Sequence, residues 1–298
     1  MVNRQVEVID AAFEGTLPAK LALGHAPDTV SLYWLGQAGF VLVCGEHSWL
    51  IDPYLSDSLA EKYAGTRFPH TRMMDAPISV GELPSLQGVF CTHRHTDHMD
   101  PGTLLPLFNS PKQKNTWLVA PRAEITEARI RSRLPDTKIS TFTDGESLTF
   151  PGGLRVFAIP AAHEEIERDS AGNCVYLGYI FEFKSDKGYL RIWHSGDCIP
   201  YPELPQWLSR LKPDVALLPV NGRDNVRKIN GVPGNFTLEE AVNICIEAGI
   251  THMVAHHVGL FHFNTENPAR IAAYATEKAD MICIWPATLN REYRLSLR

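Results

Sequence analysis

The sequence lacks the features that mark membrane-spanning and secreted proteins. No apolar run approaches the ~18 residues that a membrane-spanning helix needs. Residues 1–15 contain acids and no continuous apolar segment, so we expect no signal peptide. The six cysteines show no CxxC spacing, which favours reduced, packed thiols over disulfides. We therefore expect a cytoplasmic protein with no membrane partner.

The charge balance lacks the basic excess of a nucleic-acid-binding protein. The 298 residues include 34 acids and 28 Lys or Arg, a net charge of −6. This balance argues against a nucleic-acid partner, but it leaves open a small anionic substrate held by a local basic loop. We find no internal repeat and no low-complexity segment. At ~150 residues per domain, the length alone allows two domains.

Strand-rich stretches alternate with β–α stretches along the chain. The first short apolar segments have brief connections, which predict an antiparallel meander. Strand–helix units follow, and then the same order repeats. We therefore expect an α+β protein in which two β/α halves pack sheet to sheet, a four-layer αββα sandwich. The expected strands and helices lie at 31–36, 40–44, 48–52, 88–92, 101–108, 116–120, 121–134, 214–220, 237–249 and 251–257, with a β-rich stretch at 138–196, a helix beginning at 268 and a strand at 281–285.

The segment CTHRHTDHMD (91–100) points to a metal site. His93 and His95 follow an apolar strand, and residues two apart in an extended segment point the same way. Asp97 and His98 stand where the chain turns into the next expected helix, so they can face a second ion. The alternative is a histidine-rich turn without a metal, in which several buried imidazoles would need other partners. Imidazole and carboxylate ligands suit Zn, Mn or Fe.

Three later strand ends supply further candidate ligands. His163 follows the apolar segment LRVFAIP, and Asp197 follows YLRIWHSG, where Gly196 leaves room for close approach. His256 and His257 end THMVAHH. Since such ligands must converge, we expect residues 1–298 to form a single domain with the site at the shared edge of its halves.

Together these motifs resemble the metallo-β-lactamase-fold hydrolase superfamily. The segments WLGQAGF, THRHTDH, HSGD and HHVGLF carry the resemblance, and their combination is similar to the L-ascorbate-6-phosphate lactonase branch. The resemblance implies two ions: His93, His95 and His163 would hold the first, Asp97, His98 and His257 the second, with Asp197 bridging. Asp52 would orient a ligand from behind, unless it is an ordinary strand-end acid, and His256 would point away from the ions.

Two divalent ions lower the pKa of a bound water to near neutrality, which supports hydrolysis. Asp97 is then the candidate catalytic residue that moves a proton from this water to the leaving oxygen. We expect Mn or Zn, with Fe as a further possibility, since the ligand set does not select among them. The leading hypothesis is a lactonase acting on a small sugar (phosphate) lactone such as L-ascorbate 6-phosphate. The alternative is a phosphodiesterase of the same fold.

Candidate substrate-binding residues lie in three segments. The basic loop 220–236 contains Asn221 and Arg223, although it is equally consistent with a solvated surface loop. The long segment 53–84 contains Tyr54, together with Arg67, Phe68 and Arg72 that could close over a ligand. His262 lies shortly after the last candidate ligand and could contact the substrate, although a purely structural role for this histidine is equally consistent with the sequence. The sequence leaves the oligomeric state open, and the family resemblance favours a homo-oligomer.

Overall fold

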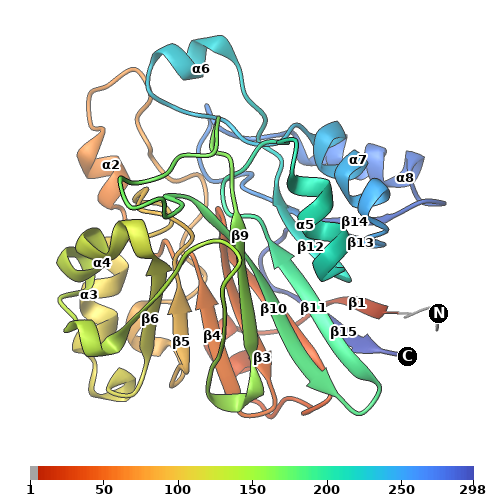
Figure 1. Ribbon diagram of the computed structural model, residues 1–298, viewed down its shortest axis with the longest axis horizontal. Coiled ribbons are helices and arrows are strands. Elements are labelled where there is room, and N and C mark those ends of the chain that lie inside the picture. Colours follow the sequence, from red (N-terminus) through yellow and green to blue (C-terminus); the bar gives the residue numbers. More distant parts are fainter. Residues whose placement is uncertain (1–5) are drawn as a thin grey trace.

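Two β-sheets packed face to face form the centre of the protein (Figure 1). The computed structural model describes residues 6–298, so residues 1–5 of the segment considered for a signal peptide lie outside the described range. The first sheet has the strand order β1-β15-β2-β3-β4-β5-β6-β7 and the second β14-β13-β12-β11-β10-β9-β8. The strands are β1 (Val6–Ala12), β2 (Val30–Gly36), β3 (Gly39–Cys44), β4 (His47–Ile51), β5 (Gly88–Phe90), β6 (Trp117–Pro121), β7 (Ile139–Phe142), β8 (Ser147–Thr149), β9 (Arg155–Pro160), β10 (Leu177–Ser185), β11 (Gly188–His194), β12 (Val215–Pro219), β13 (His252–His256), β14 (Cys283–Pro286) and β15 (Arg291–Leu297).

Each sheet combines an antiparallel part with a parallel part. Strands β2, β3 and β4 form the expected meander, and β4 to β7 are parallel. In the second sheet β8 to β11 are antiparallel neighbours, whereas β11 to β14 are parallel. Since β9 and β11 both run antiparallel to β10, their carboxyl ends lie at the same edge as those of β12 and β13.

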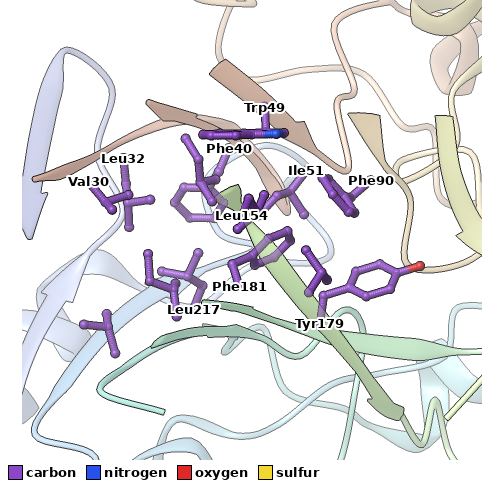
Figure 2. Packing of buried hydrophobic residues seen from close by; sticks show 14 of the residues in the cluster. Val30, Leu32, Phe40, Trp49, Ile51, Phe90, Leu154, Tyr179, Phe181 and Leu217 are labelled. Atoms are coloured by element: carbon purple, nitrogen blue, oxygen red, sulfur yellow. The ribbon is translucent and has the colours of Figure 1, made fainter. Parts of the chain in front are cut away.

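Alternate side chains on one strand enter two different cores. On β2, Leu32 and Trp34 belong to the cluster between the sheets, whereas Tyr33 and Leu35 belong to the cluster under the helices of the first sheet. Figure 2 shows the inter-sheet cluster, in which Phe40 of the first sheet and Phe181 of the second are both buried. Because both faces of each sheet are covered, the strands read as continuous apolar runs.

Helices cover the outer face of each sheet. In Figure 1, α3 and α4 lie beside β5 and β6, while α5, α7 and α8 lie on the side of β12 to β14. The second sheet's outer cluster contains Ala216 and Leu218 of β12 packed with Leu238 and Val242 of α7. This arrangement confirms the expected αββα sandwich. The helices are α1 (Leu17–Leu21), α2 (Ser58–Lys62), α3 (Pro101–Asn109), α4 (Ile125–Ser132), α5 (Leu204–Leu211), α6 (Asn225–Ile229), α7 (Leu238–Ala248) and α8 (Pro268–Glu277).

The helix predicted at 237–249 has the expected ends. Thr237 and Glu240 form a capping box, in which each side chain accepts from the other's backbone N–H. Gly249 ends α7 in the left-handed conformation with φ of 72°. Among residues 6–298, no helix is long and apolar enough to cross a membrane.

Several elements differ from the sequence-based expectation. Strands β1 and β15 and helices α1, α2, α5 and α6 were not predicted, and α2 and α6 lie within segments expected to be loops. The helix expected to begin at Pro121 starts with a 3₁₀ turn, and α4 proper begins at Ile125. The C-terminal strand β15 belongs to the first sheet, where it pairs with β1 and β2, although the other strands of the second half of the chain form the second sheet. Such pairing joins chain ends that no local pattern connects.

Candidate metal centre

The candidate ligands converge at one edge of the two sheets, as expected. His93 and the residues that follow it come after β5, and His163 comes after β9. Asp197 follows β11, and His257 follows β13 directly. The carboxyl ends of neighbouring parallel strands meet at one edge, so these loops lie together.

The structure brings the seven predicted ligands into two groups that share one carboxylate. In each group the candidate ligand atoms all lie within 4.8 Å of one another. Asp197 belongs to both groups, so one carboxylate is common to them. The first group is His93, His95, His163 and Asp197, and the second is Asp97, His98, Asp197 and His257.

Several buried polar atoms in these groups lack hydrogen-bond partners among the described residues. They include Nε2 of His93, Nε2 of His98 and both ring nitrogens of His163, together with Oδ1 of Asp197. A buried polar atom without a partner is costly, and a cation coordinated by these atoms would remove that cost. The nitrogen and oxygen donors, with no thiolate among them, fit divalent Zn, Mn or Fe.

Asp52 holds one ligand histidine from behind. His98 Nδ1 donates to Asp52 Oδ2 at 2.7 Å, which leaves Nε2 of His98 facing the second group. Asp52 also accepts from the backbone N–H of Thr92 at 2.8 Å and from its hydroxyl at 2.7 Å. All three side chains are fully buried. This is the orienting position that was expected for Asp52.

Gln37 contacts the second group but was assigned no role from the sequence. Its Nε2 donates to Asp97 Oδ2 at 2.9 Å and lies 3.0 Å from Nε2 of His257. The His257 backbone N–H in turn donates to the Gln37 carbonyl at 3.0 Å. Gln37 stands within WLGQAGF, so the only sequence signal was a polar side chain inside an apolar motif.

Unusual backbone conformations gather around the centre. Gln37, Asp52 and His257 have φ values of 49°, 42° and 62°, in the left-handed region that non-glycine residues rarely adopt. Gly196 has φ of 63°, and a Cβ there would lie 2.9 Å from the Leu177 carbonyl oxygen. Glycine is therefore required before Asp197, as the sequence suggested. Strained residues persist where the surrounding structure fixes them, as is common at functional sites.

The electrostatics of the centre favour positive charge. Burial alone would lower the pKa of His257, but the carboxylates of Asp197 and Asp97 raise it to about 9. Burial would likewise raise the pKa of Asp197, but His98 and His257 hold it well below its usual range. At His163 burial dominates and lowers the pKa to about 4, which keeps this imidazole neutral and able to act as a ligand.

A cavity of about 400 Å³ opens over both groups. His95, Asp97, His163, Asp197 and His257 form part of its lining. The 53–84 segment contributes a second wall that includes the expected Arg67 and Phe68, and residues 230–233 after α6 contribute another. Further lining residues were not singled out individually from the sequence, although the first three lie in the 53–84 segment: Lys62, Tyr63, His70, Arg94 and Arg131.

The four predicted substrate-binding residues do not line this cavity. Arg223 instead makes a bidentate pair with Glu240 at 2.6 Å for each bond, because the capping-box carboxylate lies within its reach. Tyr54 is buried, and its hydroxyl accepts from the Leu59 backbone N–H.

Asn221 and His262 also lie away from the cavity surface. Asn221 is buried and donates to Asn264 at 2.6 Å, so its amide supports a lining residue from behind. His262 is exposed and is not part of the cavity lining. The expected substrate contacts of all four residues therefore need correction.

His256 points away from the ligand groups, as expected. Its ring stacks on His194 with centroids 5.0 Å apart, and Phe40 contacts it edge-on. His194 donates from Nε2 to the Ala38 carbonyl and accepts from the Gly196 N–H at Nδ1. Within the described part of the chain, both ring nitrogens of His256 lack a hydrogen-bond partner. The structure therefore gives His256 a packing contact and no orienting one.

Comparison with known proteins relates both the sequence and the fold to metallohydrolases. Residues 47–258 match the family described as Beta-lactamase superfamily domain. A UPF0173 metal-dependent hydrolase of Rubrobacter xylanophilus is 25% identical over 249 residues, covering 82% of this chain and 88% of the relative. The metallo hydrolase Igni18 of Ignicoccus hospitalis has a TM-score of 0.65 at 19% identity, covering 89% of this chain and 98% of that one. The metallo-beta-lactamase fold protein YhfI of Bacillus subtilis has a TM-score of 0.58 at 15% identity, covering 90% and 99%.

Proposed function

The chain belongs to the family described as Beta-lactamase superfamily domain and has the metallo-β-lactamase fold. From this premise we propose that it is a metal-dependent hydrolase that opens a small anionic lactone. The observation that carries the proposal is the sharing of Asp197 between two groups of candidate ligands beneath one cavity. A sugar phosphate lactone such as L-ascorbate 6-phosphate is the substrate class we favour.

Divalent ions held by these groups would supply an acidified water and an electrophilic contact for the carbonyl oxygen. His93, His95 and His163 with Asp197 would hold one ion, and Asp97, His98 and His257 with Asp197 the other. Mn and Zn both suit this donor set. Asp52 fixes the tautomer of His98 by accepting its Nδ1–H, so that Nε2 remains a free donor atom.

The Asp97 carboxylate supplies the proton transfer in this proposal. It faces the cavity and is held in place by the Gln37 amide. As the oxygen of a water bonds to the lactone carbonyl carbon, Asp97 accepts a proton from that water. The carbon–oxygen bond of the ring then breaks, and Asp97 returns the proton to the leaving oxygen. The products are the ring-opened hydroxy acid and the regenerated carboxylate.

The cavity surroundings support a substrate that is small and negatively charged. Its volume of about 400 Å³ is in the range of small-molecule sites. Among residues 6–298, four Lys or Arg side chains line it, and the two acids in the lining both belong to the ligand groups. An anionic substrate would therefore meet an attractive field on approach.

The proposal is tested by assaying the metal-loaded protein on L-ascorbate 6-phosphate, on neutral lactones and on a phosphodiester, bis(4-nitrophenyl) phosphate. We expect lactone opening that needs Mn or Zn and that falls at least ~10²-fold in Asp97→Asn. His262→Ala is the matched control, since His262 lies outside the cavity. If the protein hydrolyses the phosphodiester and leaves the lactones unreacted, a phosphodiester becomes the substrate class in place of a lactone. Inactivity on every substrate would overturn the proposal.

A further inference from the structure

The cavity over the ligand groups has an excess of basic side chains. Within the described residues, its only acidic lining residues are Asp97 and Asp197, which are candidate ligands. The basic lining residues are Lys62, Arg67, Arg94 and Arg131. These four side chains differ in whether another group of the protein already neutralises their charge.

Two of these cations are already engaged by the protein. Arg131 Nε donates to Glu127 at 2.9 Å, and its Nη1 donates to the Met99 carbonyl at 3.0 Å. Arg94 Nη1 lies 3.5 Å from the carboxylate of Glu124, which is buried. These two side chains therefore support the structure around the ligand loop.

Lys62 and Arg67 have no acidic partner in the part of the chain that the structure describes. Each instead lies over an aromatic ring of its neighbour. Lys62 Nζ is 5.0 Å from the centroid of the Tyr63 ring, and the Arg67 guanidinium is 5.6 Å from that of Phe68. A cation–π contact positions a cation without neutralising it, so both charges remain available to a ligand.

The rings beneath these cations are fixed to the body of the protein. Tyr63 stacks on His70 with centroids 4.3 Å apart, and Phe68 lies 4.9 Å from Phe263, which comes from the segment after β13. The start of the 53–84 segment, which carries Lys62 and Arg67, is anchored as well, because the Ser56 hydroxyl donates to Asp100 at 2.7 Å. Figure 1 shows α2 and α6 at the same end of the molecule.

We propose that Lys62 and Arg67 form a subsite for the anionic group of the substrate, a carboxylate or a phosphate, while the scissile bond lies at the ligand groups. This inference rests on the proposed function and adds the position of the negative charge. An anion bound here breaks no existing ion pair, and Arg67 can contact two of its oxygens at once. Tyr63 and Phe68 supply apolar contact for the body of the ligand beside that charge.

The subsite is tested first by binding, in the full-length protein freed of metal by chelation. Isothermal titration would measure glutarate and inorganic phosphate separately against wild type and Lys62→Gln/Arg67→Gln. The matched control is Arg155→Gln/Lys187→Gln, since Arg155 also lies over a phenylalanine ring, 4.5 Å from the centroid of Phe157, but outside the cavity. We expect anion binding to weaken about tenfold in Lys62→Gln/Arg67→Gln and not in the control. Tighter binding of glutarate indicates a carboxylate as the substrate's anionic group, and tighter binding of phosphate indicates a phosphate.

Equal binding by wild type and Lys62→Gln/Arg67→Gln, or binding of neither anion, would overturn the subsite. A second measurement compares the metal-loaded proteins on the mono-4-nitrophenyl ester of glutaric acid and on neutral 4-nitrophenyl butyrate. In Lys62→Gln/Arg67→Gln we expect KM for the anionic ester to rise about tenfold, and the fall in kcat/KM to be much smaller for the neutral ester than for the anionic one. An equal loss on both esters contradicts the proposal. If wild type hydrolyses no lactone or ester, the proposed function fails while the anion titration still decides the subsite.

Discussion

Gln37 donates from Nε2 to Asp97 Oδ2 at 2.9 Å, although sixty positions separate the two residues in the chain. The bond joins the β2–β3 turn to the loop after β5, and Gln37 is 1% exposed. The same amide nitrogen lies 3.0 Å from His257 Nε2. Gln37 thus fixes the position of the proposed catalytic carboxylate relative to a ligand of the second group.

Replacing Gln37 by alanine should lower activity more than stability. The Asp97 carboxylate would lose its donor and could rotate, so we expect kcat to fall roughly 10- to 100-fold, the range found for partners of metal ligands. Steady-state kinetics, together with the midpoint of thermal unfolding, would measure both effects. Gln206→Ala is the control, since Gln206 is exposed on α5. An unchanged kcat in Gln37→Ala would show that Asp97 needs no such support.

The sharing of Asp197 predicts a pattern of metal stoichiometry. After dialysis against low metal, wild type should retain about two ions per chain, and His163→Ala and His257→Ala about one each, because each change weakens one group. Asp197→Asn should retain less than either, because it weakens both groups. Plasma mass spectrometry of the dialysed proteins would measure this, with His262→Ala as the unaffected control. Two retained ions in Asp197→Asn would refute the bridging position.

Removal of metal should lower the melting temperature. Each ion that binds only the folded chain adds about 2.7 kcal/mol at ~100 times its Kd. For a chain of this size that corresponds to a loss of roughly 5 °C for each ion removed by chelation. Differential scanning calorimetry with and without chelator would measure the shift. In Asp197→Asn the same chelator should produce a much smaller shift, and an equal shift would mean that the ions bind elsewhere.

Asp52→Asn should weaken metal binding through His98. The variant lacks the charge that stabilises the Nδ1–H of His98, so the imidazole loses its fixed tautomer. We expect metal affinity to fall about 10- to 100-fold, measured by competition with a coloured chelator. Asp144→Asn is a matched control, because Asp144 pairs with Arg168 outside the cavity. Equal affinity in the two variants would remove the orienting role of Asp52.

Glu292 should make stability depend on pH at acid values. Burial would raise the pKa of Glu292, but hydrogen bonds from Arg294, Ser31 and Lys20 outweigh it and lower the pKa to about 2. A lowered folded-state pKa stabilises the protein above the unfolded value near 4.5, and this stabilisation is lost as the pH falls toward 2. Glu292→Gln should therefore be less stable than wild type at pH 7 by ~1–3 kcal/mol.

Urea unfolding at several pH values would follow this difference. The gap between wild type and Glu292→Gln should narrow steadily from pH 4.5 to the lowest pH at which both still fold. Glu239→Gln serves as a control, because Glu239 pairs with Arg270 at the exposed surface. A gap that stays constant across this range would assign the effect of Glu292 to packing instead of charge.

Local sequence patterns were sufficient where neighbouring residues decide the structure. The capping box of Thr237 and Glu240 and the glycine at Gly249 act within one helix, and α7 begins and ends there. His93, His95, Asp97 and His98 lie within six positions, so the turn after β5 alone brings them close together.

Long-range contacts decided what local patterns could not. Strand β15 pairs with β1 across almost the whole chain, and the charged Glu292 is held there by Ser31 of β2. Arg223 lies in a basic loop that the sequence made a candidate for substrate binding. In the folded protein its guanidinium instead pairs with the Glu240 carboxylate of α7.

The sequence by itself determined which residue types would form the centre and at which strand ends they stand, because ligand chemistry and strand patterns are local properties. Only the tertiary structure decided which cations remain free to meet a ligand. Whether a long side chain such as Arg223 or Arg67 faces the cavity depends on which acids folding brings within a few ångströms of it, and no spacing along the chain encodes those distances.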